Sequence, residues 1–170
     1  KSYGAYGVGN VVWGVGYSEL DGNGQNADGS FRAGVLSAEW TAGAINMLRN
    51  MMNHYAAVPA SSAHFDAAQK YLADIKRDEA SMLEGVQQLR FENYVAAGFS
   101  GKPENYAALF PQLSAQKGSP QAVQPYLYAS RRYLVPFGWY ANPLPSTCAT
   151  AWMIMLSHGF DPLRYAGKPN

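Results

Sequence analysis

The strongest constraint on the fold is a helical periodicity that begins after Ser37. This serine is a favourable N-cap, and the segment from Ala38 to about Tyr55 places apolar residues at three- and four-residue spacing. These residues form two adjoining rows opposite a narrow polar stripe, and so wide an apolar face predicts a helix that is mostly buried. The rows are Trp40, Ala44, Met47 and Met51, then Thr41, Ile45, Leu48, Met52 and Tyr55; the stripe is Asn46, Arg49, Asn50 and Asn53.

A second helical segment follows the break at Val58-Pro59, where Ser61 or Ser62 can provide an N-cap. Its apolar spacing is interrupted once, at Glu79. The pattern therefore allows either one long bent helix or two helices joined near Asp78. Acidic residues in the turn after Asp78 favour two helices. The apolar positions are Phe65, Ala68, Leu72 and Ile75, and then Met82, Val86 and Leu89.

A last helix is predicted between Ser146, its N-cap, and Gly159, which ends it. It is apolar on nearly every side, which is typical of a helix inside a larger core. Its apolar run, Ala149 to Leu156, is far too short to cross a bilayer, so we expect no transmembrane segment. Cys148, the single cysteine, is predicted to be a buried structural residue.

Two short β components are also predicted. The stretch Tyr3 to Tyr17 is rich in Gly, Val and aromatic residues, which favours one or two short strands. Residues Tyr126 to Tyr128 and Tyr133 to Phe137 favour a hairpin turned at Ser130-Arg131, and a helix through the same stretch is the alternative. The expected fold class is mainly α, with helical hairpins and a small β-hairpin component, in a single domain over 1–170 or in part of a larger one.

The charge balance excludes some classes of partner. Only 15% of the residues are charged, and 13 basic against 12 acidic residues leave a net charge of +1. No cluster of Lys or Arg exceeds a pair, so we expect no nucleic-acid partner. A surface built largely from Gly, Ser, Asn, Gln and Tyr suits polar, uncharged partners and a secreted or periplasmic location.

We expect neither a metal nor another cofactor. Cys148 has no His or Cys neighbour at metal-ligand spacing. The loop that carries Asp21 and Asp28 could supply oxygen ligands to calcium. However, Asn26 stands where an EF-hand loop requires Gly, and Arg32 stands where it requires a bidentate Glu.

Aromatic rings and amides point to a carbohydrate-binding surface. The apolar face of a sugar packs on such rings, while Asn and Arg side chains hydrogen-bond its hydroxyls. The alternative is that at least half of these rings belong to the core. Trp139 and Tyr140 are the expected exceptions, because their loop is hard to bury whole. The predicted substrate-binding residues are Trp13, Tyr17, Trp40, Arg132, Trp139, Tyr140 and Asn142.

Glu39 is the most suggestive catalytic carboxylate. It falls in the first turn of the first helix beside Trp40, and a carboxyl next to an indole can have a raised pKa, as a general acid in glycoside cleavage requires. Asp21 or Asp28 would be its counterpart. The alternative is that Glu39 only complements the helix dipole. Glu92 is a further candidate that pairing with a basic neighbour explains equally well.

Three segments together carry a resemblance to a known family. They are SAEWTAGAI at 37–45, YASRRYLVPFGWYANP at 128–143 and PSTCATAWMIML at 145–156. As a pattern of helices and aromatic loops, from about Val11 to the tail, the chain resembles the C-terminal half of (α/α)-toroid carbohydrate-active enzymes. In such enzymes helical hairpins form concentric rings, with the sugar cleft in the loops at one end. This chain is too short for a full ring, so an incomplete toroid that pairs with a missing N-terminal fragment or a second chain is expected.

The resemblance implies a glycoside hydrolase, or part of one, that acts on a neutral polysaccharide or oligosaccharide outside the cytoplasm. The alternative, from a different class, is a non-catalytic helical module that binds glycan or assembles an envelope complex. Since the sequence begins at Lys1 without Met or a signal sequence, we expect a processed form or an excised piece.

Overall fold

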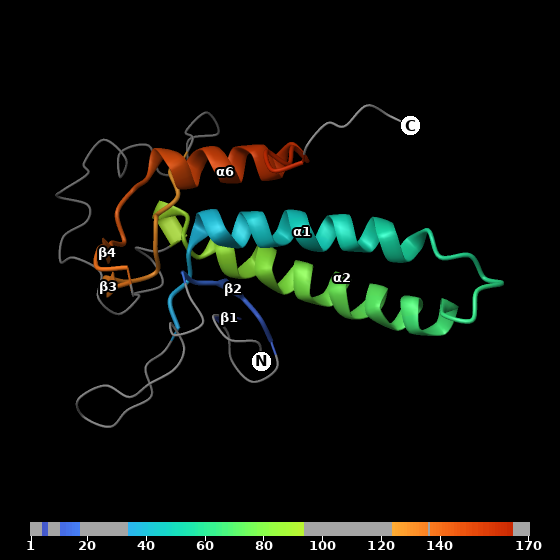
Figure 1. The fold of residues 1–170 in the computed structure, drawn as a ribbon. Coiled ribbons are helices and arrows are strands. Elements are labelled where there is room, and N and C mark those ends of the chain that lie inside the picture. The colour runs from blue at the N-terminus through green and yellow to red at the C-terminus, as the bar shows by residue number, and fades with distance from the viewer. Residues whose placement is uncertain (1–4, 7–10, 18–33, 94–123, 136, 165–170) are drawn as a thin grey trace, which may run out of the picture.

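The computed structural model describes residues 5–6, 11–17, 34–93, 124–135 and 137–164. These residues form a mainly helical fold with two small sheets (Figure 1), as expected. The helices are α1 (Ala38–Ala56), α2 (Phe65–Gln87) and α6 (Thr147–Ser157). The strands are β1 (Ala5–Tyr6), β2 (Gly14–Val15), β3 (Tyr133–Leu134) and β4 (Tyr140–Ala141).

Helices α1 and α2 form a long antiparallel hairpin, and α6 packs on α1 beside it (Figure 1). Helix α1 begins where the sequence predicts, because Ser37 Oγ accepts a hydrogen bond from Trp40 N at 3.4 Å. It ends one residue beyond the predicted boundary, at Ala56. Since α1 contacts both other helices, it is the central element of the described fold.

The main core lies where the three helices meet. Its side chains are withdrawn from water, and each large one stabilises the fold by roughly 1.5–3 kcal/mol relative to exposure. These core side chains join α1 to α2, to α6 and to the segment that contains Leu127. Its buried members include Leu36, Ile45, Met82, Val86, Leu89, Leu127, Met153 and Leu156.

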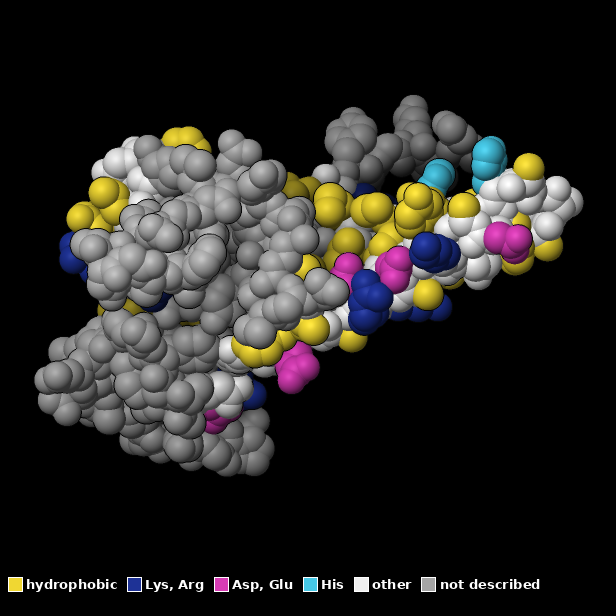
Figure 2. Space-filling view, turned by 90° about the horizontal axis from the view of Figure 1, so that it is seen from below, with side chains coloured by type: hydrophobic (Ala, Val, Ile, Leu, Met, Phe, Trp, Pro, Cys, Tyr) yellow, Lys and Arg dark blue, Asp and Glu magenta, His cyan; other side chains and the backbone are white. Residues whose placement is uncertain are grey.

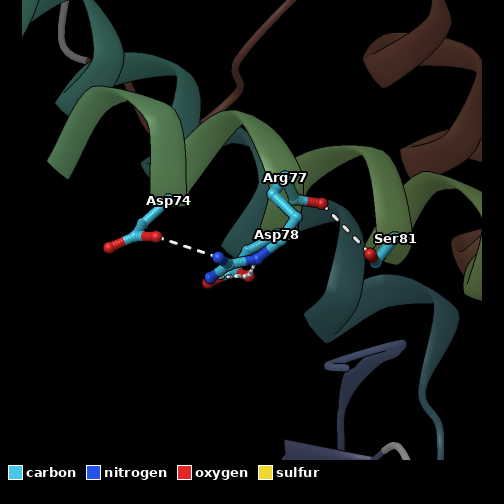
Figure 3. Close-up of polar contacts among 4 residues, drawn as sticks. All are labelled: Asp74, Arg77, Asp78 and Ser81. Atoms are coloured by element: carbon cyan, nitrogen blue, oxygen red, sulfur yellow. Dashed lines mark hydrogen bonds and ion pairs between the residues drawn. The ribbon is translucent and has the colours of Figure 1, made fainter. Parts of the chain in front are cut away.

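Helix α2 is one continuous helix, so the predicted junction near Asp78 is wrong. Glu79 interrupts the apolar spacing because its carboxylate pairs with Arg49 of α1, with 2.7 Å between Oε1 and Nε. On the outer face, Arg77 pairs with Asp74 at 2.9 Å and Asp78 at 3.1 Å (Figure 3). The acidic residues near this point therefore belong to a helix interior and not to a new N-terminus.

The predicted serine cap of α2 is also wrong in detail. The residue at the N-cap is His64, and its side chain makes no capping hydrogen bond. Ser62 Oγ instead accepts from His64 N at 3.2 Å, one step before the helix. This serine thus stabilises the turn between α1 and α2 and leaves the first turn of α2 uncapped by a side chain.

Strand β3 pairs with β4 and not with residues 126–128, so the predicted turn at Ser130-Arg131 is wrong. The register aligns Tyr133 with Ala141 and Leu134 with Tyr140. The reversal falls between the strands, where Gly138 adopts φ +87°, a conformation that favours glycine.

Residues 126–129 instead make isolated bridges to distant parts of the chain. Tyr126 bridges to Arg90, Leu127 to Pro145, and Ala129 to Ser37. At the other end of the chain, the structure has two short strands within residues 3–17, as the sequence predicts, and these strands, β1 and β2, pair antiparallel. Short extended segments thus gather at the end of the helical hairpin where α1 begins and α2 ends.

Helix α6 begins and ends as predicted. Ser146 Oγ accepts from Ala149 N at 3.2 Å, and Gly159, at φ +69°, follows the last turn. Cys148 is exposed, which contradicts its predicted burial. Cys148 falls outside the buried face of α6, which begins one position later, at Ala149. Among the residues that the structure describes, no helix is long and apolar enough to span a membrane.

Candidate functional site

Three aromatic rings from distant segments meet near the N-terminal end of α1. Tyr17 lies 5.6 Å from Tyr128 and 5.5 Å from Trp139 between ring centroids, and the Tyr128–Trp139 distance is 6.0 Å. The Tyr17 ring meets the Trp139 indole edge to face at 77°. Tyr17 is buried, whereas 41% of Trp139 is exposed. This cluster, with the neighbouring Arg132 and Tyr140, is called the aromatic site below.

Backbone and side-chain hydrogen bonds hold the buried ring in place. Tyr17 Oη donates to the carbonyl oxygen of Tyr128 at 3.1 Å, and burial raises the pKa of the Tyr17 phenol, which keeps it protonated. Strand β2, two residues earlier, is attached to the start of α1. Ser37 N donates to Val15 O at 3.0 Å, and Val15 N donates to Thr41 Oγ1 at 3.1 Å. The floor of the aromatic site is therefore fixed to a helix.

The outer part of the site is the β3–β4 hairpin. Val135 N donates to Trp139 O at 2.9 Å, which closes the turn that presents the indole. The Arg132 guanidinium carbon lies 4.0 Å from the centroid of the Tyr140 ring, a cation–π contact. Asn142 donates from Nδ2 to Tyr140 O at 3.2 Å. Phe137, at the tip, is 76% exposed. The hairpin thus offers several rings to solvent.

Glu39 lies at the border of this cluster. Burial is the main cause that raises the pKa of Tyr128, and the negative charge of Glu39 raises it further. The pKa of Cys148 is also raised, first by the partial burial of its thiol and then by a hydrogen bond to the Glu39 carboxylate and the negative charge of that group. Glu39 is in the first turn of α1 and Cys148 in the first turn of α6, so the two helix N-termini adjoin the aromatic site.

The remaining predicted residues are Trp13, Trp40, Asp21 and Asp28. Trp13 lies against α2, with its carbonyl group next to Gly85. Trp40 is exposed on the first turn of α1. Asp21 and Asp28 lie outside the described residues. Glu92 pairs with Arg90 at 3.2 Å, which confirms the structural alternative for that carboxylate.

Tyr128 is the member of the site that the sequence did not single out. Tyr128 was predicted to lie in a hairpin arm, whereas its ring contacts are with Tyr17 and Trp139. Within the described part of the chain, no group of three or more His, Cys, Asp or Glu side chains could hold a metal ion.

The described fold and site define a mainly helical protein with a partly exposed aromatic surface beside two helix N-termini. No known protein family, curated protein or solved structure matches the chain.

Proposed function

We propose that the protein binds a neutral glycan at the aromatic site. The observation that carries this proposal is the state of Trp139, whose indole is held against a buried tyrosine yet is 41% exposed. A ring that is already immobilised loses little further freedom when a sugar packs on it. Tyr140 adds a second exposed ring, and the pyranose C–H face is the apolar surface that such rings accept.

The polar groups beside the rings favour hydroxyl ligands. The Arg132 guanidinium lies over the Tyr140 ring, and its N–H groups can donate to a hydroxyl beside that ring. The chain as a whole carries a net charge of only +1. Neither feature provides the concentrated positive charge that an anionic polymer requires.

Affinity electrophoresis in gels that contain neutral polysaccharides tests this proposal. Trp139→Ala and Tyr140→Ala should each weaken retention by roughly tenfold in Kd, the effect of about 1.4 kcal/mol. Tyr71→Ala is the matched control, because Tyr71 is 53% exposed, close to the 48% of Tyr140, and belongs to α2 near the far end of the hairpin. Equal retention of all variants, or a loss in the control alone, would refute the aromatic site.

Hydrolysis of a glycosidic bond is the second candidate function. It is favoured by Glu39, whose charge reaches Tyr128 and whose carboxylate interacts with Cys148 at the border of the site. Glu39 would be the general acid, and Asp21 or Asp28 the second carboxyl, at a separation of about 5–9 Å. Glu39→Gln should abolish the release of reducing ends while leaving glycan retention intact. Unchanged turnover in this variant would remove Glu39 from any mechanism.

We also propose that the chain forms an incomplete (α/α)-toroid. Large apolar side chains are exposed along α1, α6 and the segment after α6, and a missing fragment or a second chain would cover such surface. They include Met47, Ile154, Phe160 and Leu163. Light scattering after gel filtration tests for a second chain, and the scarcity of charged residues supports a secreted or periplasmic location that cell fractionation can check.

A further inference from the structure

A separate polar pocket lies between α1, α2 and the segment that follows α6. The aromatic site adjoins the N-terminal end of α1. Figure 1 shows α1 between α2 and α6. Its volume is about 390 Å³, within the range of small-molecule sites. Its polar lining comes from Asn46, Arg49, Asn50 and Asn53 of α1, Glu79 of α2, and Asp161 and Arg164 after α6.

Asn46 lines this pocket and carries a buried donor without a partner in the described part of the chain. The residue is only 4% exposed, and within the described residues its side-chain Nδ2 has no hydrogen-bond partner. A buried polar group without a partner destabilises a protein, so such groups are rare unless something satisfies them. An oxygen of a bound molecule would accept this hydrogen bond.

The walls around Asn46 are fixed by hydrogen bonds between different elements. Arg49 donates from Nε to Glu79 Oε1 at 2.7 Å and from Nη1 to Leu156 O at 3.1 Å. Asn50 donates from Nδ2 to Asp161 Oδ2 at 3.0 Å. These contacts join α1 to α2 and to the end of α6, so the pocket exists before any ligand arrives.

The charges that line the pocket select the class of ligand. Two arginines and two carboxylates give a formal sum of zero, and Arg49 and Glu79 already neutralise each other. The lining therefore offers both donors and acceptors without a surplus of either charge. Hydroxyl groups both donate and accept, and so match such a lining.

We propose that this pocket binds a single neutral sugar or another polyol, with a hydroxyl oxygen accepting from Asn46 Nδ2. The Arg164 guanidinium can donate to a second hydroxyl, and the Glu79 carboxylate can accept from a third. This site does not depend on the aromatic site, and a failure of either leaves the other standing. Figure 2 shows charged side chains of both signs along the projecting hairpin, consistent with a surface that carries no single-sign field.

Titration of the ¹⁵N-labelled chain with glucose, galactose, mannose and glycerol tests the proposal. The side-chain amide signals of Asn46, identified by their loss in Asn46→Leu, should shift saturably with at least one of these probes. Arg164→Ala should weaken that binding about tenfold, and because Arg164 is exposed the variant keeps the fold. Asn93→Ala changes an exposed asparagine beyond the C-terminal end of α2, outside the pocket lining, and should leave binding unchanged.

Three results would overturn the proposal. The first is the absence of a saturable shift with every neutral probe. The second is a shift that saturates only with acetate or glycine, which would show a ligand of a different charge class. The third combines two observations: the sugar-free Asn46→Leu variant loses thermal stability, and no probe shifts the Asn46 amide signals of the parent chain. That result would show that a fixed water satisfies the amide. Whether the Trp139 signal shifts in the same titration does not affect these outcomes.

Discussion

Two helical glycines should respond to alanine in opposite directions. Gly85 is buried in α2, and a Cβ there would overlap the carbonyl oxygen of Trp13 and lie 2.7 Å from its carbonyl carbon. These are backbone atoms, which cannot rotate away as a side chain would. Gly43 lies in α1, where a Cβ would meet nothing within 4 Å. The pair therefore separates helix propensity from packing.

The magnitudes follow from these two effects. In a helix, alanine is favoured over glycine by about 1 kcal/mol, and Gly43→Ala should gain roughly 0.5–1 kcal/mol of unfolding free energy. At Gly85 the same gain is opposed by overpacking, which costs about 1–3 kcal/mol and more when backbone must shift. We expect a net loss of about 1.5–2 kcal/mol. The two variants should thus differ by roughly 2–3 kcal/mol.

Urea denaturation followed by circular dichroism measures both variants against the parent chain. The midpoint should rise for Gly43→Ala and fall for Gly85→Ala, with unchanged slopes. In thermal unfolding the difference corresponds to about 4–12 °C, at roughly 2–4 °C per kcal/mol for a chain of this size. A Gly85→Ala variant as stable as the parent would show that Trp13 does not lie against α2, and would refute the described packing.

Two further predictions concern Glu39 and Arg49. Because burial and Glu39 raise the pKa of Cys148, less of its thiol is ionised at a given pH in the folded chain. Its iodoacetamide rate profile should lie at higher pH than in the urea-unfolded chain, and Glu39→Gln should move it part of the way back; coincident profiles would contradict the contact. Arg49→Met should lose about 1–3 kcal/mol by leaving the largely buried Glu79 carboxylate unpaired, in the same urea assay. Arg77→Met should leave stability unchanged, since its two ion pairs are exposed, and an equal loss in both variants would refute this distinction.

The starts of α1 and α6 were predictable from the sequence because their signals are local. Ser37 and Ser146 each cap a helix through an amide three residues later, and Gly159 follows the last turn of α6. The continuity of α2 was not predictable in this way. The residue that breaks its apolar pattern, Glu79, has its partner Arg49 thirty residues away.

The β3–β4 hairpin and the aromatic site show the same limit. Pairing of residues 126–129 depends on bridges to three distant segments, which no local pattern reveals. Likewise, Tyr17 and Trp139 were both identified as candidate rings, but their contact and the third ring, Tyr128, arise only from the fold. Gly138 is a local signal for the observed turn, whereas the predicted turn at Ser130-Arg131 contains no glycine.

We propose that a neutral glycan packs on the indole ring of Trp139. The chain has four tryptophans, so its indole N–H signals can be resolved by NMR and assigned through their loss in single variants. When a polysaccharide that retards the chain in gels is titrated in as soluble oligosaccharides, the Trp139 signal should shift saturably, and the Trp13 signal should stay in place. A Trp139 signal that does not move while the oligosaccharide binds would contradict the account.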